Sequence, residues 1–443
     1  ALFAGLRGDR AVALAVSGGG DSMGLMVLFA DWLAQEDADP APHVVLTVDH
    51  GLRPQSASEA LAVAGSARKL GFQHAILPWS GPKPRTGLQA AAREARYRLM
   101  GEYMAGQGIG TLLLAHTRDD QAETLLMRLA RGSGLDGLAA MAPISEVAGQ
   151  DGSGPLRLVR PLLGIAKDRL QATLKARGVS WVEDPSNADA SFERARWRAN
   201  RVALEAAGLG GEALATSAAR LRRARAAVEA ATDALCDPHT GLVRTDPSGF
   251  FDVDRGRLRS APEEIALRVI GRCIAAAGGA GEPVPLSGLE TIVAGLLQGV
   301  AGAPETVWTL ARARIAVDAC RIRIDREPGR TPLPVAAMKA GSSLIWDGRF
   351  RIEADAEVGC CLDVRALGRD GLRELKRAGR PLKGTPVLLL VPSLWSGERL
   401  VAVPTAGYWA EEGLARHVRA DFLGLPYNSP GRDKPRAPDL EVT

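Results

Sequence analysis

Six residues near the N-terminus have the composition of a phosphate-binding turn. They connect an apolar run at 11–16 to an amphipathic run at 22–35, and they are Ser17, Gly18, Gly19, Gly20, Asp21 and Ser22. Glycines let a ligand approach the backbone closely, and the exposed N–H groups and dipole at a helix start favour an anion. A tight turn with Asp21 as the helix cap is the simpler interpretation. The strand–turn–helix context favours the anion site.

Two common phosphate loops do not fit this turn. The Walker loop needs Gly-Lys followed by Ser or Thr, a combination that occurs nowhere in the chain. The dinucleotide fingerprint needs a third glycine three residues after the second, and counting from Gly18 and Gly20 that position is Met23. The turn therefore belongs to another class of nucleotide site.

The acidic run that follows His116 is a second group of residues that could bind a ligand or take part in catalysis. Asp120 and Glu123 are three residues apart, so they share one face of a predicted helix. Two carboxylates that face a pocket are a suitable receptor for an ammonium group, through charge-assisted hydrogen bonds. Thr117 and Asp120 also have the spacing of a helix capping box. Both roles are compatible, since a capping residue can line a site.

These residues require a sheet that brings them together. Short apolar runs alternate with helical patterns, and near-continuous apolar character is typical of strands that are buried on both faces. We predict strands at 11–16, 43–48, 72–77 and 111–115, and helices at 22–35, 57–70, 88–105 and 119–130. Gly71 suits the position after a helix end. The alternation predicts an α/β fold with a doubly wound parallel sheet, whose ligands bind at the carboxyl ends of the strands. Polar clusters follow the first, second and fourth predicted strands, as SGGGDS, DHGLRP and HTRDDQAET.

The remainder of the chain predicts further domains. We expect the catalytic domain at 1–205 and a mostly helical middle domain at 206–326, which ends in a hairpin. A small α+β domain is expected at 335–428. The segment 327–334 has the proline and glycine content of a linker, and the tail 429–443 is expected to be disordered.

Composition limits the function classes. The chain has 443 residues, of which 46% are hydrophobic, and this share is typical of packed domains. Its net charge of +4 is too small to indicate a nucleic-acid-binding protein by itself. Its five cysteines form no C-x-x-C pair, which argues against a disulfide framework, a structural zinc site and a cysteine-held iron–sulfur cluster. We find no apolar run of about 20 residues, and the first ten residues lack the long apolar region that is typical of a signal peptide. These features predict a cytoplasmic protein with no membrane association.

The SGGGDS turn resembles the pyrophosphate loop (PP-loop) of the ATP pyrophosphatases, which follow the pattern S-G-G-x-D-S and split ATP between the α and β phosphates. Further segments occur in the order VDHGLRP, AAAREARYRLM, AHTRDDQAET, RGSGLDGL, RPLL and EDPSN. This series resembles the tRNA(Ile)-lysidine synthetase family over residues 11–201, and again weakly at 381–408. The resemblance implies adenylation of the wobble cytidine of tRNA(Ile) with a CAU anticodon, followed by attack of free L-lysine. It implies no stable protein partner.

The resemblance also implies roles for individual residues. Ser17 to Ser22 would bind ATP, with Asp21 holding Mg²⁺, and Asp120 and Glu123 would recognise lysine. Arg93 would lie near the α-phosphate or the adenylated base, and His116 would contact the nucleotide or base. Arg194 and Arg198 match family positions, and arginines on successive turns here predict contacts with RNA phosphates. Ala195 departs from the asparagine that the family usually has, which removes one polar contact. The C-terminal domain is expected to bind tRNA.

Three other functions are weighed against this interpretation. A tRNA cytidine 2-thiolation enzyme shares the PP-loop but is expected to carry paired cysteines, which this chain lacks. An ammonia- or glutamine-dependent amidotransferase would be expected to show a cysteine-containing glutaminase signature. A non-catalytic tRNA-binding protein would not need an intact loop together with Asp21, Asp120 and Glu123.

Overall fold

The computed structural model describes most of the chain in two compact units. The described ranges are 2–52, 55–84, 86–147, 156–183, 193–279, 284–298, 306–329, 332–358, 362–380 and 386–425. The first unit ends at Ala227 and the second begins at Val228, within helix α9 (Gly211–Cys236). The predicted linker falls partly, and the predicted tail wholly, outside the described ranges. The predicted domain borders stay predictions.

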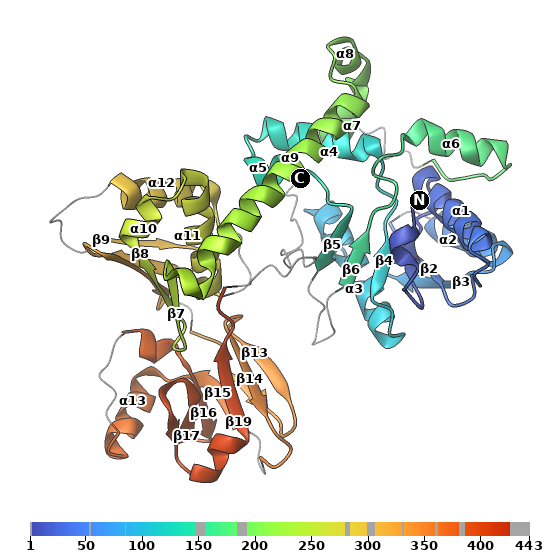
Figure 1. The fold of residues 1–443 in the computed structure, drawn as a ribbon. Helices are drawn as coiled ribbons and strands as arrows, with labels where there is room; N and C mark the ends of the chain where they lie inside the picture. The colour runs from blue at the N-terminus through green and yellow to red at the C-terminus, as the bar shows by residue number, and fades with distance from the viewer. Residues whose placement is uncertain are drawn as a thin grey trace. The chain divides into compact units, whose positions relative to one another are not determined.

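The first unit contains the predicted parallel sheet (Figure 1). Within the described ranges its strand order is β3-β2-β1-β4-β6-β5, and only the edge strand β5 runs antiparallel to its neighbour. The strands are β1 (Ala13–Ala15), β2 (Val44–Asp49), β3 (Gln73–Pro78), β4 (Thr111–Leu113), β5 (Ile144–Val147) and β6 (Leu156–Val159). The chain order reverses between β1 and β4, so the switch point where such sheets bind ligands lies between these two strands.

Helices pack against both faces of this sheet. The α-helices that precede α9 in this unit are α1 (Gly20–Gln35), α2 (Ser56–Lys69), α3 (Leu88–Gly106), α4 (Arg118–Ala130), α5 (Leu135–Leu138), α6 (Lys167–Ala176), α7 (Glu193–Ala199) and α8 (Arg201–Ala206). One core joins the sheet to α1, α2 and α6 through Met26, Val63 and Leu170. A second core on the opposite face joins it to α3 through Met100 and Met104. The doubly wound fold is therefore confirmed.

The predicted elements of this unit are confirmed to within a few residues. Each apolar run became a strand, and each helical pattern became a helix. Gly71 has a φ of +83°, as expected for the glycine that follows α2. Strands β5 and β6 were not predicted. Each has only four residues, which is too short for a period-two pattern to be distinguished from a loop.

The second unit combines helices with antiparallel sheets (Figure 1). Its middle part includes α10 (Arg255–Arg259), α11 (Glu263–Gly278) and α12 (Leu286–Gln298). Within the described ranges a five-stranded sheet has the order β7-β8-β11-β10-β9. Its strands are β7 (Val243–Asp246), β8 (Phe250–Asp254), β9 (Thr306–Leu310), β10 (Ala313–Val317) and β11 (Arg321–Arg326). The middle part is thus less purely helical than the sequence suggested. The predicted hairpin strands pair with a second hairpin, β7–β8, that the sequence analysis had not separated from the helical region.

The last part of this unit is the expected small α+β fold. Five described strands are ordered β12-β15-β16-β17-β18, and three are ordered β13-β14-β19. They are β12 (Ala336–Met338), β13 (Ser343–Trp346), β14 (Phe350–Ala354), β15 (Leu362–Ala366), β16 (Pro392–Ser396), β17 (Arg399–Val403), β18 (Tyr408–Trp409) and β19 (Val418–Phe422), with helix α13 (Gly368–Arg377). Among the described helices of the whole chain, none combines the length and apolar composition that crossing a bilayer requires.

Candidate active site

The glycine turn has the geometry of an anion site. Gly18 has a φ of +90°, which favours glycine, and a Cβ there would lie 3.3 Å from Val63. The Ser17 N–H donates to Ser22 Oγ at 3.2 Å, and the Ser22 hydroxyl donates to the Gly19 carbonyl at 2.9 Å. Helix α1 begins directly after Gly19. Its first N–H groups have no partner within the helix, so they are available to a ligand at the end of β1.

A segment that lies far away in sequence packs against this turn. The Val182 N–H donates to the Gly18 carbonyl at 2.9 Å. A Cβ on Gly20 would lie 3.4 Å from the indole of Trp181. That distance is an ordinary van der Waals contact, so the indole ring packs directly against the turn. Trp181 and Val182 therefore support the turn from one side.

Asp21 lies in the first turn of α1 and already has a cationic partner. The Lys167 Nζ lies 3.2 Å from its Oδ2, while its Oδ1 is buried with no hydrogen-bond partner among the described residues. Burial raises the pKa of Asp21 above its usual range; the charge of Lys167 opposes this, and that of Asp120 adds to it. The Asp120 effect shows that the glycine turn and the acidic run lie close together.

The carboxylate of Asp21 suits a magnesium ion. Carboxylate oxygen is the ligand type that Mg²⁺ prefers, and Mg²⁺ in nucleotide sites is commonly held by one or two carboxylates and by substrate phosphates. The unpartnered Oδ1 of Asp21 is a free ligand atom of this kind. Among the described side chains, no group of three or more His, Cys, Asp or Glu residues is arranged to hold a metal by itself. The residues fit an ion that binds together with ATP.

The acidic run begins helix α4 at the end of β4, and two of its carboxylates stabilise helix ends. Thr117 and Asp120 form the capping box: the Thr117 N–H donates to Asp120 Oδ2 at 2.8 Å, and the Asp120 N–H donates to Thr117 Oγ1 at 3.4 Å. Asp119 accepts the backbone N–H of Lys167 at 2.8 Å and so caps α6. Of the pair predicted to bind lysine, Asp120 therefore has one oxygen engaged by its own helix.

Glu123 faces the same site and forms a strong ion pair there. Arg198 donates to both of its carboxylate oxygens, at 2.6 and 3.1 Å, and lies 3.9 Å from Asp120. Burial raises the pKa of Glu123, although Arg198 opposes this shift. Burial also acts to lower the pKa of Arg198, but Glu123, Asp120 and Asp21 together outweigh burial and the net shift is upward. A residue predicted to contact tRNA thus occupies the predicted lysine receptor.

The arginines of α3 provide the opposite charge, and His116 lies close to them. Burial lowers the pKa of His116 to about 3; Asp120 opposes this, and the charges of Arg160, Arg96 and Arg93 add to it. His116 is therefore neutral at physiological pH, with one donor and one acceptor nitrogen. The pKa of Asp120 is lowered: burial alone would raise it, but His116, Thr117 and Arg194 outweigh burial. The side chain of Ala195 lies outside those that the structure describes.

Several buried polar atoms around this edge have no partner among the described residues. They come from the ends of β2 and β4, from α1 and from α3, and they are Asp21 Oδ1, His50 Nδ1, Arg93 Nε, Arg96 Nε and His116 Nδ1. Buried polar groups in proteins are nearly always hydrogen-bonded, so such a cluster indicates a ligand site. Sequence analysis assigned no role to His50 or Lys167. The cluster DHGLRP was the signal for His50, and no local pattern indicated Lys167.

Comparisons with known proteins agree with this geometry. A family model described as a PP-loop domain matches residues 2–204. A curated protein of Bradyrhizobium diazoefficiens named tRNA(Ile)-lysidine synthase is 45% identical over 352 residues, which cover 74% of this chain and 93% of that protein. The protein of that name from Ruegeria pomeroyi is 38% identical, with 90% of this chain and 89% of that protein covered. The one from Brucella suis biovar 1 is 35% identical, with 99% and 95% covered.

Proposed function

The chain belongs to the tRNA(Ile)-lysidine synthase family, and we propose that it joins free L-lysine to C2 of the wobble cytidine of tRNA(Ile) with a CAU anticodon. The reaction passes through an adenylated cytidine and releases pyrophosphate and then AMP. The observation that carries this proposal is that an anion-binding turn and a buried pair of carboxylates meet at the switch point of one sheet. We place this reaction in the cytoplasm.

The adenylation step uses the end of β1. The backbone of Ser17 to Ser22 binds the phosphates of ATP, and Asp21 holds Mg²⁺, which when bound offsets charge on the phosphates. Arg93 stabilises charge that develops as the cytosine oxygen attacks the α-phosphate. His116 is neutral, so it can donate one hydrogen bond and accept another at the edge of a base without adding a charge.

The second step uses the end of β4. Glu123 and Asp120 receive an ammonium group of lysine at the position that Arg198 occupies in its ion pair with Glu123. Displacement of Arg198 leaves its guanidinium available to an RNA phosphate, which is a preferred partner of arginine. Lysine recognition and contact with tRNA by Arg198 and Arg194 are then two parts of one rearrangement.

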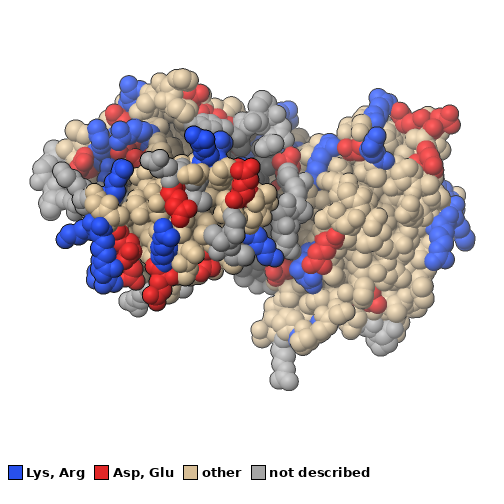
Figure 2. All heavy atoms as spheres, turned by 90° about the horizontal axis from the view of Figure 1, so that it is seen from below, with Lys and Arg blue, Asp and Glu red and all other residues tan. Residues whose placement is uncertain are grey.

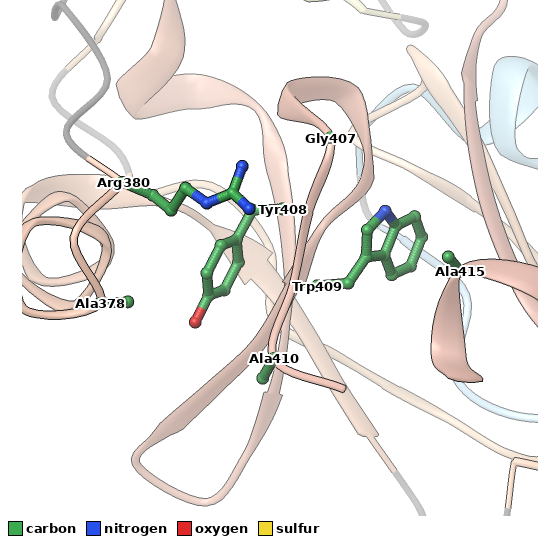
Figure 3. Close-up of a pocket in the computed structure, with 7 residues that line it drawn as sticks. All are labelled: Ala378, Arg380, Gly407, Tyr408, Trp409, Ala410 and Ala415. Carbon is green, nitrogen blue, oxygen red and sulfur yellow. The ribbon is translucent and has the colours of Figure 1, made fainter. Parts of the chain in front are cut away.

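Contacts outside the catalytic sheet are needed to hold a tRNA. Figure 2 shows that basic and acidic side chains are interspersed on the face in view, with no extended basic area. A hollow of about 360 Å³ in the C-terminal part offers another kind of contact, because Arg380, Tyr408 and Trp409 line it (Figure 3). Tyr408 lies on the side of Arg380, and Trp409 extends toward Ala415. An aromatic ring beside an arginine, as Tyr408 is beside Arg380, suits an unpaired base. These features support tRNA binding by this part.

One incubation tests the reaction. The protein is mixed with ATP, radiolabelled lysine and tRNA(Ile) with a CAU anticodon, and label in the tRNA is counted together with AMP and pyrophosphate. We expect one AMP and one pyrophosphate for each lysine incorporated. The matched control is the same tRNA with uridine at the wobble position, which should remain unlabelled. Tight tRNA binding without incorporation would contradict the proposal and support the tRNA-binding alternative. Equal labelling of the control would exclude the wobble cytidine as target.

A further inference from the structure

The phosphate loop of this chain contains no cationic side chain of its own. Its six residues are Ser17 to Ser22, and their only charged member is Asp21. A Walker loop, by contrast, includes a lysine that reaches the β- and γ-phosphates. Lys167, from a distant part of the sequence, lies at the rim of this loop with its Nζ 3.2 Å from Asp21 Oδ2. We propose that Lys167 binds the β- and γ-phosphates of ATP, the part that leaves as pyrophosphate.

The backbone of Lys167 is fixed relative to both halves of the site. Its N–H donates to Asp119 Oδ2 at 2.8 Å, and the Arg118 N–H donates to the Ile165 carbonyl at 3.0 Å. These bonds join the start of α6 to α4. On the other side, a Cβ on Gly24 would lie 3.4 Å from Leu170, which shows that α6 packs closely against α1. The flexible stem of lysine can then move its ammonium group between Asp21 and a phosphate.

Neighbouring cations are less suited to this role because they have carboxylate partners elsewhere. Arg198 is bound by both oxygens of Glu123. Arg201 pairs with Glu205 at 2.8 Å, Asp168 at 3.3 Å and Asp119 at 3.6 Å. Lys167 differs, because its partner is the loop aspartate itself. Among these three cations, Lys167 is therefore the one whose partner lies within the phosphate loop.

The proposal rests on the adenylation reaction proposed above, and its test is a set of binding measurements that do not need that reaction. Calorimetry measures the affinity of the full chain for pyrophosphate, for a non-hydrolysable ATP analogue and for AMP. Lys167→Met should weaken binding of pyrophosphate and of the analogue by about tenfold to a hundredfold, the range for one charge-assisted hydrogen bond. AMP lacks the β- and γ-phosphates and so makes none of the contacts proposed for Lys167. Its affinity should therefore change by less than about twofold, which is the size of change expected from a substitution at an independent site.

Three further variants keep the test decisive. Lys167→Arg retains the charge and should recover most of the affinity for pyrophosphate. Lys175→Met removes an exposed lysine from the same helix and should change none of the three affinities. If Lys167→Met unfolds early in a thermal scan, Lys167→Gln replaces it, because glutamine keeps much of the length without the charge.

Either of two results would overturn the proposal. One is wild-type affinity for pyrophosphate and the ATP analogue in the folded Lys167→Met or Lys167→Gln protein. The other is an equal loss of AMP affinity, which would show that Lys167 only supports the shape of the loop. A wild-type protein that binds pyrophosphate but incorporates no lysine would contradict the proposed function and leave the result for Lys167 standing.

Discussion

The ion pair between Glu123 and Arg198 makes a sharp prediction about lysine binding. Arg198→Gln removes the cation from a carboxylate whose side chain is only 11% exposed. A hydrogen bond to a charged group contributes about 1.5–3 kcal/mol, and breaking a fully buried pair costs about 3–5 kcal/mol. Because the Arg198 side chain is 35% exposed, the lower range applies. The variant should therefore lose about 1.5–3 kcal/mol of folding stability.

In this pair Arg198 competes with lysine for the carboxylate of Glu123. In the wild-type protein the contacts between Arg198 and Glu123 must break before an ammonium group can reach Glu123. The variant has no such contacts to break. If this competition costs about 1.4 kcal/mol, the variant should bind free lysine about tenfold more tightly. Calorimetric titration of lysine, with an ATP analogue present and tRNA absent, measures the change. Arg196→Gln is the control, because Arg196 is an exposed arginine of the same helix.

The opposite result would refute this reasoning. Lysine binding that is unchanged or weaker in folded Arg198→Gln would show that Arg198 does not exclude lysine from Glu123. Weaker binding would instead mean that the guanidinium contributes to the lysine site, for example by contacting the lysine carboxylate. Thermal unfolding gives an independent measure, because a ligand that binds the folded state raises its stability in proportion to RT ln(1 + [L]/Kd).

Three further predictions concern other parts of the chain. Asp21→Asn should abolish both pyrophosphate release and lysine transfer but leave tRNA affinity nearly intact, and near-normal pyrophosphate release would contradict the role of Asp21. His116→Asn should flatten the pH dependence of stability measured by urea unfolding. The pKa of His116 is about 3 in the folded chain and about 6.5 in the unfolded chain, so between these pH values the unfolded state binds more protons. Wild-type stability therefore falls as the pH drops below about 6.5, by up to about 1.4 kcal/mol per pH unit. Equal slopes for the wild-type protein and the variant would contradict the buried neutral state of His116. Tyr408→Ala should weaken tRNA binding by about 1–3 kcal/mol, the range for one stacked base, at constant salt; unchanged affinity would exclude a base stacked beside Arg380 in the hollow of Figure 3.

The parallel sheet could be predicted because its signals are local. Each strand that is buried on both faces is an apolar run, and each helix that covers it has a helical period. The sheet of the middle part was harder, since β7 and β8 are four and five residues long and lie after the long helix α9. The turn Asp246-Pro-Ser-Gly249 between them was the available hairpin signal.

The site could be predicted only in outline. The rule that ligands bind at the carboxyl ends of parallel strands was enough to bring the glycine turn and the acidic run together. The partners of these groups were not predictable, because they are distant in sequence. Arg198 is 75 residues from Glu123, and Lys167 lies on a helix whose own pattern indicates only packing. Such pairs depend on how helices dock, which local patterns do not specify.

Together the two ion pairs favour the ionised forms of Asp21 and Glu123, whose pKa values burial raises. Asp120 raises the pKa of Asp21, so without Lys167 and Arg198 these groups would repel each other and tend to take up protons. With those cations in place, ligand binding exchanges one ion pair for another and leaves no bare charge. The exchange at Glu123 releases an arginine that an RNA phosphate can bind. Lysine and tRNA should therefore favour each other's binding, and by thermodynamic linkage the factor must be the same in both directions.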